Sequence, residues 1–376
     1  LNTRFDIVGF DPRGVGASSG ISCLSDAAEE AYNELDVVLD DPQEKQAAID
    51  ADKMYAAACR QRNARVLPFV DTVSAAKDID RIRAALGDEE LNYLGFSYGT
   101  FLGQTYAHLF PTHIRAMVLD GVLDPSVEAN DLSLVYVTGF ESNLQAFLAN
   151  CRAHATVAPR CSFAQGGDPG TRLNNLMQRL DATPVPVGTL NLTRAMAVTG
   201  VQAALFDQSS WPYLDLGLTQ ADRGNGALLL SLAESLLQAD PPDQNWAVTC
   251  LDRPVPTDVA AYDALVPAFT KASPFFGPAF VYGNLVCAYW PVKATGKAGP
   301  LSANGAPPIL LVGGTNDPAT PYVWAQSVNK QLAGSVLLTR TGNGHGSYGT
   351  SECSSAATDA YLFNLALPAR GTVCSS

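Results

Sequence analysis

Residues 91–100, LNYLGFSYGT, decide the fold of this chain. The apolar run from Leu91 to Phe96 predicts a short buried strand, and a helix is predicted from Thr100 up to the proline at position 111. The G-x-S-x-G sequence of residues 95–99 lies between them. Small residues at its two glycine positions permit a sharp strand-to-helix turn, because larger side chains would clash with the neighbouring backbone. Such a turn exposes the hydroxyl of Ser97, which we predict to be a nucleophile.

The segments on either side continue an alternation of strands and helices. Residues 5–10 predict a short buried strand, and residues 72–86 have apolar side chains at helical spacing. Asp71 is suited to begin that helix, and Gly87 is suited to end it. A third strand is expected at residues 116–119. Strands and helices that alternate at this pitch form a parallel sheet.

The alternation is interrupted in the middle of the chain. Between residues 126 and 305 the patterns are helical only, with proline-rich joints between them. The alternation resumes with an apolar strand at residues 308–312 and a helix near 322–332. We therefore predict an α/β fold with a mostly parallel sheet flanked by helices, formed by residues 1–125 and 306–376. The expected insertion, residues 126–305, is a helical cap.

A nucleophilic serine needs a base, and the sequence contains four histidines. His108 and His113 lie in or just after the helix that follows Ser97, and neither can fold back to the turn. His154 belongs to the predicted cap. His345 follows a predicted strand in a loop with glycines on both sides, which permit a tight turn that aims the ring inward. We therefore predict His345 to be the base.

A carboxylate is needed to hold the tautomer of the base and to stabilise the imidazolium. Asp317 follows a buried strand and lies 28 residues before His345, which leaves room for one helix and one strand. The order Ser97, Asp317, His345 is that of the α/β-hydrolase fold. The sequence thus predicts a catalytic triad. The N–H group of Tyr98, at the start of the helix, is the expected first donor of an oxyanion hole.

Composition and charge exclude other classes of function. The formal charge is −13, which repels phosphate, so we expect no nucleic acid partner. No run approaches the ~18 apolar residues of a membrane span, so we expect no membrane partner. No C-x-x-C or H-E-x-x-H sequence occurs, and the predicted triad requires neither a metal nor an organic cofactor.

The eight cysteines fall into four couples that are local in the sequence. An even number without metal-ligand spacing favours disulfides, and hence an oxidising exterior compartment. We expect a secreted protein, with which the glycosylation sequon at Asn191 is compatible. Eight buried free thiols are the alternative. The expected pairs are Cys23–Cys59, Cys151–Cys161, Cys250–Cys287 and Cys353–Cys374.

Several segments are similar to those of one enzyme family. They are the D-x-R-G-x-G-x-S segment at residues 10–18, the nucleophile turn at 95–100, Leu119-Asp120-Gly121-Val122, the loops of Asp317 and His345, and the cysteine segments at 250–252 and 287–291. Together they resemble the α/β-hydrolase serine aminopeptidases, which include proline iminopeptidases and tripeptidyl aminopeptidases. The cysteine segments look like the tripeptidyl branch.

The resemblance implies a serine exopeptidase that cleaves peptides from a free N-terminus through an acyl-enzyme. In that family, acids of the cap recognise the α-ammonium group of the substrate. Asp252 is the first candidate for this role and Glu141 the second, although each is also suited to be a solvated acid. A secreted carboxylesterase or lipase-like hydrolase with the same triad is an alternative. A non-catalytic binding domain on a hydrolase fold is an alternative from another class.

The resemblance also concerns the start of the chain. Family members carry further strands and an H-G-G-P-G loop before the segment that begins here, and that loop supplies the second oxyanion donor. We expect the chain to be a fragment, or to be accompanied by its own cleaved N-terminal piece, and a signal peptide to have been removed. Otherwise residues 5–10 would form an exposed, hydrophobic edge of the sheet.

Overall fold

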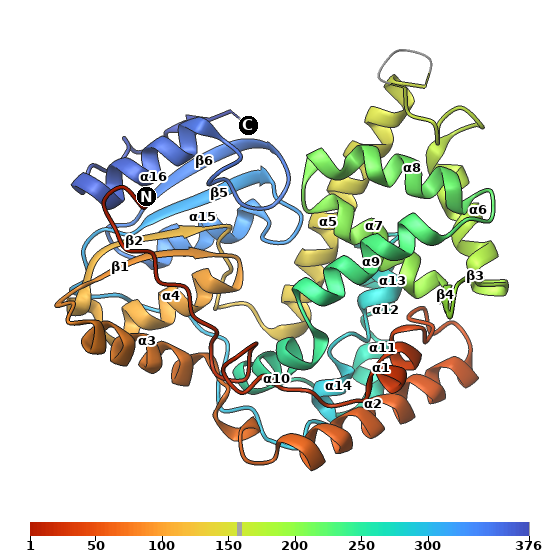
Figure 1. The fold of residues 1–376 in the computed structure, drawn as a ribbon, viewed down its shortest axis with the longest axis horizontal. Helices are drawn as coiled ribbons and strands as arrows, with labels where there is room; N and C mark the ends of the chain where they lie inside the picture. Colours follow the sequence, from red (N-terminus) through yellow and green to blue (C-terminus); the bar gives the residue numbers. More distant parts are fainter. Residues whose placement is uncertain (156–159, 376) are drawn as a thin grey trace.

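The computed structural model describes residues 1–155 and 160–375, and Figure 1 shows them as a sheet with its helices beside a larger helical body. The sheet has five strands in the order β1-β2-β5-β6-β7, and every neighbouring pair is parallel. The strands are β1 (Leu91–Phe96), β2 (Ile114–Asp120), β5 (Leu310–Asn316), β6 (Val336–Asn343) and β7 (Val373–Cys374).

Both faces of the sheet are covered by helices, which explains why its strands are apolar without alternation. On one face, Met117 and Leu119 of β2 pack against a layer that includes Ile79 and Leu102. On the other face, Val118 and its neighbours pack against α16. The first layer consists of α3 (Thr72–Leu86), α4 (Tyr98–Leu109) and α15 (Tyr322–Gln331), and the second of α16 (Glu352–Asn364). The α/β-hydrolase sheet predicted from the sequence is thus present.

The prediction of a strand at residues 5–10 was wrong. This segment has no strand assignment, and Ile7 and Val8 are 64% and 54% exposed. A strand needs a hydrogen-bonded neighbour, and no strand of the described residues pairs with this segment. Phe5 instead stacks on Phe363 of α16, with ring centroids 5.7 Å apart. As a result, β1 is an edge strand of the described sheet.

The segment between β2 and β5 is mainly helical, as expected for a cap. Its helices are α5 (Ala129–Ala153), α6 (Pro169–Ala182), α7 (Arg194–Leu205), α8 (Trp211–Ala221), α9 (Ala227–Ala239), α10 (Pro242–Asp252), α11 (Val259–Asp263), α12 (Val266–Ala272), α13 (Gly277–Phe280) and α14 (Leu285–Ala288). The expectation of helices only was wrong at one place. A short antiparallel hairpin joins β3 (Val185–Val187) to β4 (Leu190–Leu192), because Gly188 takes the positive φ of 63° that the turn needs.

Two helices from the first third of the chain belong to this helical body. They are α1 (Asp26–Asn33) and α2 (Pro42–Asn63). Tyr55 and Cys59 of α2 share a buried cluster with Ala247 and Leu251 of α10. The sequence places these two helices before the nucleophile, but the structure packs them beside the cap (Figure 1). The predicted sheet segment 1–125 therefore also contributes to the helical body.

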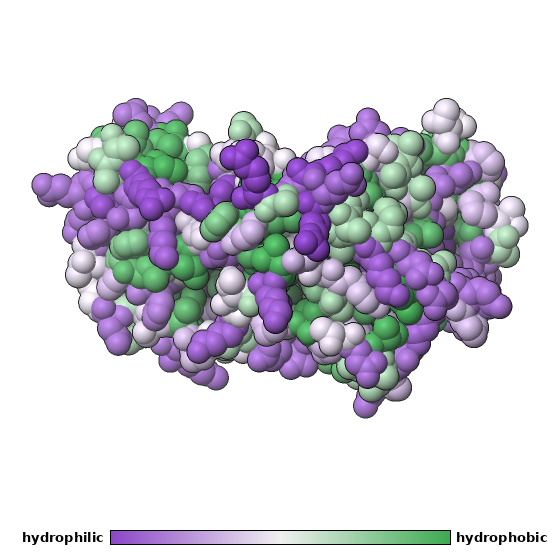
Figure 2. All heavy atoms as spheres, turned by 90° about the horizontal axis from the view of Figure 1, so that it is seen from below, coloured by the Kyte–Doolittle hydropathy of each residue, from purple (hydrophilic) through white to green (hydrophobic). Residues whose placement is uncertain are grey.

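Four disulfides are present, and they join the pairs expected from the sequence. Among the described residues, every helix is too short or too polar to cross a bilayer. On the face shown in Figure 2, hydrophilic and apolar side chains are interspersed.

Candidate active site

Ser97 lies at the tip of the turn between β1 and α4, with φ 52° and ψ −121°. A non-glycine residue at positive φ is strained, and such strain is typical of functional positions. The surrounding bonds hold it, because the Ser97 N–H group donates to the Asp120 carbonyl at 3.1 Å. A Cβ atom on Gly95 would come 2.6 Å from the Gly99 carbonyl oxygen, whereas one on Gly99 would meet only the Tyr93 hydroxyl at 3.6 Å. The predicted need for a residue without a side chain is therefore met at Gly95, whereas Gly99 has room for a Cβ atom.

His345 and Asp317 form a hydrogen-bonded pair, as the sequence predicts. His345 Nδ1 lies 2.9 Å from each carboxylate oxygen of Asp317. The carboxylate is buried, and it accepts further hydrogen bonds from the N–H groups of Ala319 at 3.0 Å and Thr320 at 2.8 Å. A carboxylate held in this way fixes Nδ1 of His345 as the protonated nitrogen and leaves Nε2 free to act as a base.

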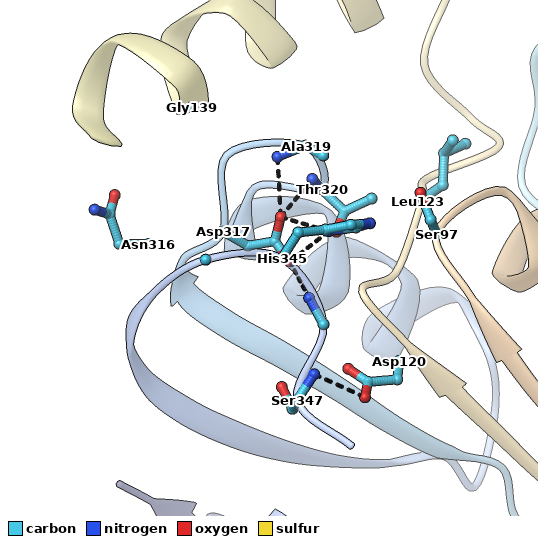
Figure 3. Close-up of polar contacts among 12 residues, drawn as sticks. Ser97, Asp120, Leu123, Gly139, Asn316, Asp317, Ala319, Thr320, His345 and Ser347 are labelled. Atoms are coloured by element: carbon cyan, nitrogen blue, oxygen red, sulfur yellow. Dashed lines mark hydrogen bonds and ion pairs between the residues drawn. The ribbon is translucent and has the colours of Figure 1, made fainter. Parts of the chain in front are cut away.

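The imidazole ring extends from Asp317 toward Ser97 (Figure 3). The Asp120 carbonyl accepts from the Ser97 N–H group, and the next residue, Gly121, lies close to His345. A Cβ atom on Gly121 would come 3.0 Å from His345 Cε1. The structure thus brings Ser97, Asp317 and His345 to the same edge of the sheet. No hydrogen bond joins Ser97 to His345 within the described part of the chain.

The largest causes that set the pKa of His345 are burial and its contact with Asp317. Burial lowers it, but the charge of Asp317 and the hydrogen bond to Asp317 raise it, so that the pKa lies above its ordinary value. The sequence analysis did not identify one neighbour, Thr320, whose hydroxyl lies 3.3 Å from Nδ1. Its position three residues after the predicted acid places it on the same loop.

Tyr98, the predicted oxyanion donor, begins α4 directly after Ser97. Its hydroxyl lies 2.7 Å from Thr72 Oγ1, and the Thr72 hydroxyl donates to Asp252 at 2.5 Å. Because Thr72 has one hydroxyl proton, Tyr98 is the donor in the first contact. The N–H group of Thr72 also donates to Asp252, at 2.8 Å.

Asp252 was predicted to bind a substrate ammonium group, and these contacts give that role no support. Its carboxylate is buried, both oxygens accept from Thr72, and the residue lines neither of the two cavities described below. Burial raises the pKa of Asp252 to about 6, and the hydrogen bonds from Thr72 oppose that rise. Glu141 on α5 accepts from Ser273 at 2.7 Å and from Gln145 at 2.7 Å, and it also lines neither cavity.

The larger cavity, of about 340 Å³, lies between the cap helices and the α1–α2 segment. Its aromatic walls are Tyr32, Tyr136, Phe206, Trp246, Phe280 and Tyr282. The ring of Phe206 also packs edge-on against His345, with centroids 5.7 Å apart. Phe206 therefore separates this cavity from the predicted base, which does not line it. A smaller cavity of about 200 Å³ lies on the other side of Phe206, beside His345 and Arg340.

The charged residues that line the larger cavity are all acidic: Asp36, Asp52 and Asp240. Asp52 is 8% exposed and accepts from the Tyr32 hydroxyl at 2.6 Å through one oxygen. Burial raises the pKa of Asp52, and likewise that of Asp36, to about 6. Sequence analysis missed these acids because Asp36 and Asp52 precede the nucleophile and reach the cavity only through the packing of α1 and α2.

A parallel sheet covered by helices, a serine on a strained strand-to-helix turn and a buried Asp–His pair define a serine hydrolase of the α/β fold. Residues 273–374 match a protein-family model described as TAP-like protein. The chain is 33% identical to the serine protease Hip1 of Mycobacterium tuberculosis, over 100% of this chain and 75% of that protein. It is 33% identical to the tripeptidyl aminopeptidase of Streptomyces lividans, over 99% of this chain and 70% of that protein. It is also 35% identical to carboxylesterase B of M. tuberculosis, over 99% of this chain and 74% of that protein. The chain therefore belongs to the tripeptidyl aminopeptidase-like family of α/β-hydrolases.

Proposed function

We propose that the protein is a secreted exopeptidase that releases short peptides from the free N-terminus of a peptide substrate. Ser97 Oγ attacks the carbonyl carbon of the scissile bond while His345 Nε2 takes the hydroxyl proton. His345 then gives the proton to the leaving amine, and water hydrolyses the acyl-enzyme by the reverse sequence of proton transfers. Asp317 holds the ring and stabilises the imidazolium, and the N–H group of Tyr98 stabilises the oxyanion.

The observation that carries this proposal is the larger cavity. An exopeptidase has to recognise a free α-ammonium group, and among the described residues the charged side chains that line this cavity are acidic. Phe206 lies between the cavity and His345, because its ring lines the cavity and also packs edge-on against the imidazole. Asp52 accepts from the Tyr32 hydroxyl through Oδ1, which leaves Oδ2 to accept from a cation in the cavity. The aromatic walls suit apolar side chains and contribute cation–π attraction.

The test compares a peptide anilide that has a free N-terminus with its N-acetylated form. We expect the wild-type protein to prefer the free form, and Asp52→Asn and Asp36→Asn each to raise KM for the free form about tenfold, a loss of ~1.4 kcal/mol. Neither variant should change KM for the acetylated form. Glu234→Gln is the matched control, because Glu234 lies on α9 but does not line the cavity. Equal turnover of both substrates by the wild type would contradict the proposal.

The second candidate function is carboxylesterase activity. A relative named carboxylesterase B shares 35% identity with the chain, and the aromatic walls of the cavity also suit acyl groups. The ratio of kcat/KM for the free peptide anilide to that for a short acyl ester separates the two. A peptidase of the proposed kind turns over the anilide, whereas an esterase turns over only the ester.

Secretion is supported by the four disulfides, which persist in oxidising compartments. The mass of the denatured, unreduced protein tests whether all eight cysteines are oxidised in the protein as produced by its host. Recovery of the protein with free thiols from inside the cell would contradict secretion.

A further inference from the structure

We propose that Asp120 and Arg340 hold the loop of His345 from opposite sides and so align the base with Ser97. We refer to these two residues as the buried clamp. Neither belongs to the predicted triad, and both are almost completely buried, at 1% and 2% exposure. The inference rests on the proposed role of the triad, but not on the identity of the substrate.

Arg340 binds the part of the loop that leads into His345. It lies on β6, and its Nη1 and Nη2 donate to the carbonyl oxygens of Asn343 at 2.9 Å and Gly344 at 2.5 Å. Its Nε donates to the Ser347 hydroxyl at 3.1 Å. Within the described residues Arg340 forms no salt bridge, so its buried charge is stabilised by hydrogen bonds to this loop and by the more distant charges of Asp317 and Asp120. A buried charge without a direct counterion is expensive, and this favours a role beyond packing.

Asp120 binds the part of the loop that leaves His345. It ends β2, and its Oδ2 accepts from the N–H group of Ser347 at 2.9 Å (Figure 3). The same oxygen accepts from the N–H group of Tyr348 at 2.7 Å. Its backbone carbonyl accepts from the N–H group of Ser97 at 3.1 Å. One residue therefore bonds to the nucleophile turn through its main chain and to the loop of the base through its side chain.

The loop requires such support because glycines flank the base. Gly344 and Gly346 have φ values of 97° and 75°, and glycine restricts the backbone least of all residues. Arg340 binds carbonyl oxygens before the histidine, and Asp120 binds N–H groups after it. Displacement of a catalytic group by about 1 Å reduces turnover about 10²-fold. The position in which the buried clamp holds His345 therefore affects the turnover rate of the triad.

The charges of the buried clamp give it a signature that packing alone would not produce. The charged groups that act on His345 are Asp317, Asp120 and Arg340. The two aspartates raise the pKa of His345, and Arg340 lowers it. Burial raises the pKa of Asp120, and the N–H groups of Tyr348 and Ser347 oppose that rise. In the pH range where Asp120 is ionised, removal of its charge should therefore lower the pKa of His345, whereas removal of the charge of Arg340 should raise it. The base must be neutral to act, so the acidic limb of kcat/KM moves in opposite directions in the two variants.

The experiment measures kcat, KM and the pH profile of Asp120→Asn and Arg340→Met on a short acyl ester, which needs no ammonium recognition. We expect kcat to fall at least tenfold in both variants with KM nearly unchanged. The acidic limb should move to lower pH in Asp120→Asn and to higher pH in Arg340→Met, and Arg340→Lys should recover part of the loss. Asp124→Asn is the matched control, because Asp124 is buried in the same connection but bonds to Ser126 and Gln331.

Asp120→Asn keeps the shape of the side chain and one acceptor oxygen, so it tests the charge in a folded protein even if Arg340→Met fails to fold. Circular dichroism and the rate of fluorophosphonate labelling confirm folding and report the reactivity of Ser97. Unchanged kcat and an unchanged pH profile in Asp120→Asn would overturn the buried clamp. Ester hydrolysis that survives in Ser97→Ala would instead overturn the triad itself, so the two failures are distinguishable.

Discussion

Gly95 is the residue on which the nucleophile turn depends sterically. The added methyl group of Gly95→Ala would meet the Gly99 carbonyl oxygen at 2.6 Å, so we expect a loss of about 1–3 kcal/mol of stability and reduced labelling of Ser97. Gly99→Ala is the control, because its methyl group has only one neighbour, at 3.6 Å, and we expect a change within about 0.5 kcal/mol. Chemical denaturation measures both. Equal losses in the two variants would show that the motif is required for another reason.

His345 gives the second prediction at the scale of a residue. Because Asp317 holds the pKa of His345 above its usual value of 6.5, the midpoint of the acidic limb of kcat/KM should lie above 6.5. Asp317→Asn removes that charge, so the limb should move to lower pH while kcat falls about 10⁴-fold through the wrong tautomer. Steady-state kinetics between pH 4 and 9 check both effects. An unmoved limb in Asp317→Asn would assign the titration to another group.

The segment of α1 and α2 supplies one wall of the larger cavity, and Cys23–Cys59 encloses α1 and most of α2 in a covalent loop. We expect the double variant Cys23→Ser/Cys59→Ser to lose ~2–4 kcal/mol of stability. It should also raise KM for peptides more than it lowers kcat, because the wall loosens while the triad stays in place. The control is Cys353→Ser/Cys374→Ser, which releases α16 from β7, away from the cavity. A similar rise in KM in the control would refute this division of roles.

The sequence predicted well those elements whose signals are local. The strand β1, the turn at Ser97 and the helix α4 follow from adjacent residues, and the Asp317 and His345 loops follow from their places after strands. Residues 5–10 look like a strand but lack a pairing partner in the described chain, and pairing cannot be judged from one segment. The hairpin β3–β4 was missed although Gly188 marks its turn.

The roles of individual acids were the hardest to predict. Asp252 has the sequence features of a surface acid of the cap, and only the packing of α10 against α3 brings it to Thr72. Asp36 lies between α1 and α2, and Asp52 lies on α2. This segment precedes the nucleophile in the sequence and joins the cap only in three dimensions. Contacts of this kind depend on tertiary packing, which a single sequence does not show.

The whole molecule should be more stable in mildly acidic than in neutral solution. Burial raises the pKa of Asp52, Asp243 and Asp252 to about 6, so their folded forms bind protons more tightly than the unfolded chain does. The stability that they contribute is complete below about pH 4 and is lost as the pH rises through 6. The raised pKa of His345 acts in the same direction, because its contribution to stability is also lost as the pH rises.

Differential scanning calorimetry at pH 5 and pH 8 checks this expectation, with Tm falling at the higher pH. The ion-paired Asp78 and Asp222 have lowered pKa values, and their contribution is lost only below about pH 4, so they do not oppose the trend in this window. Asp52→Asn should reduce the difference in Tm between pH 5 and pH 8. A higher Tm at pH 8 in the wild type would contradict the assigned shifts.

The covalent loop closed by Cys23 and Cys59 has a consequence for the diversification of this scaffold. It confines one wall of the cavity to a short, contiguous stretch that contains no member of the triad. We therefore expect that residues 24–58 can be exchanged between relatives without a change in the triad. Chimeras made at these two cysteines would then inherit substrate preference from the donor and reactivity from the recipient.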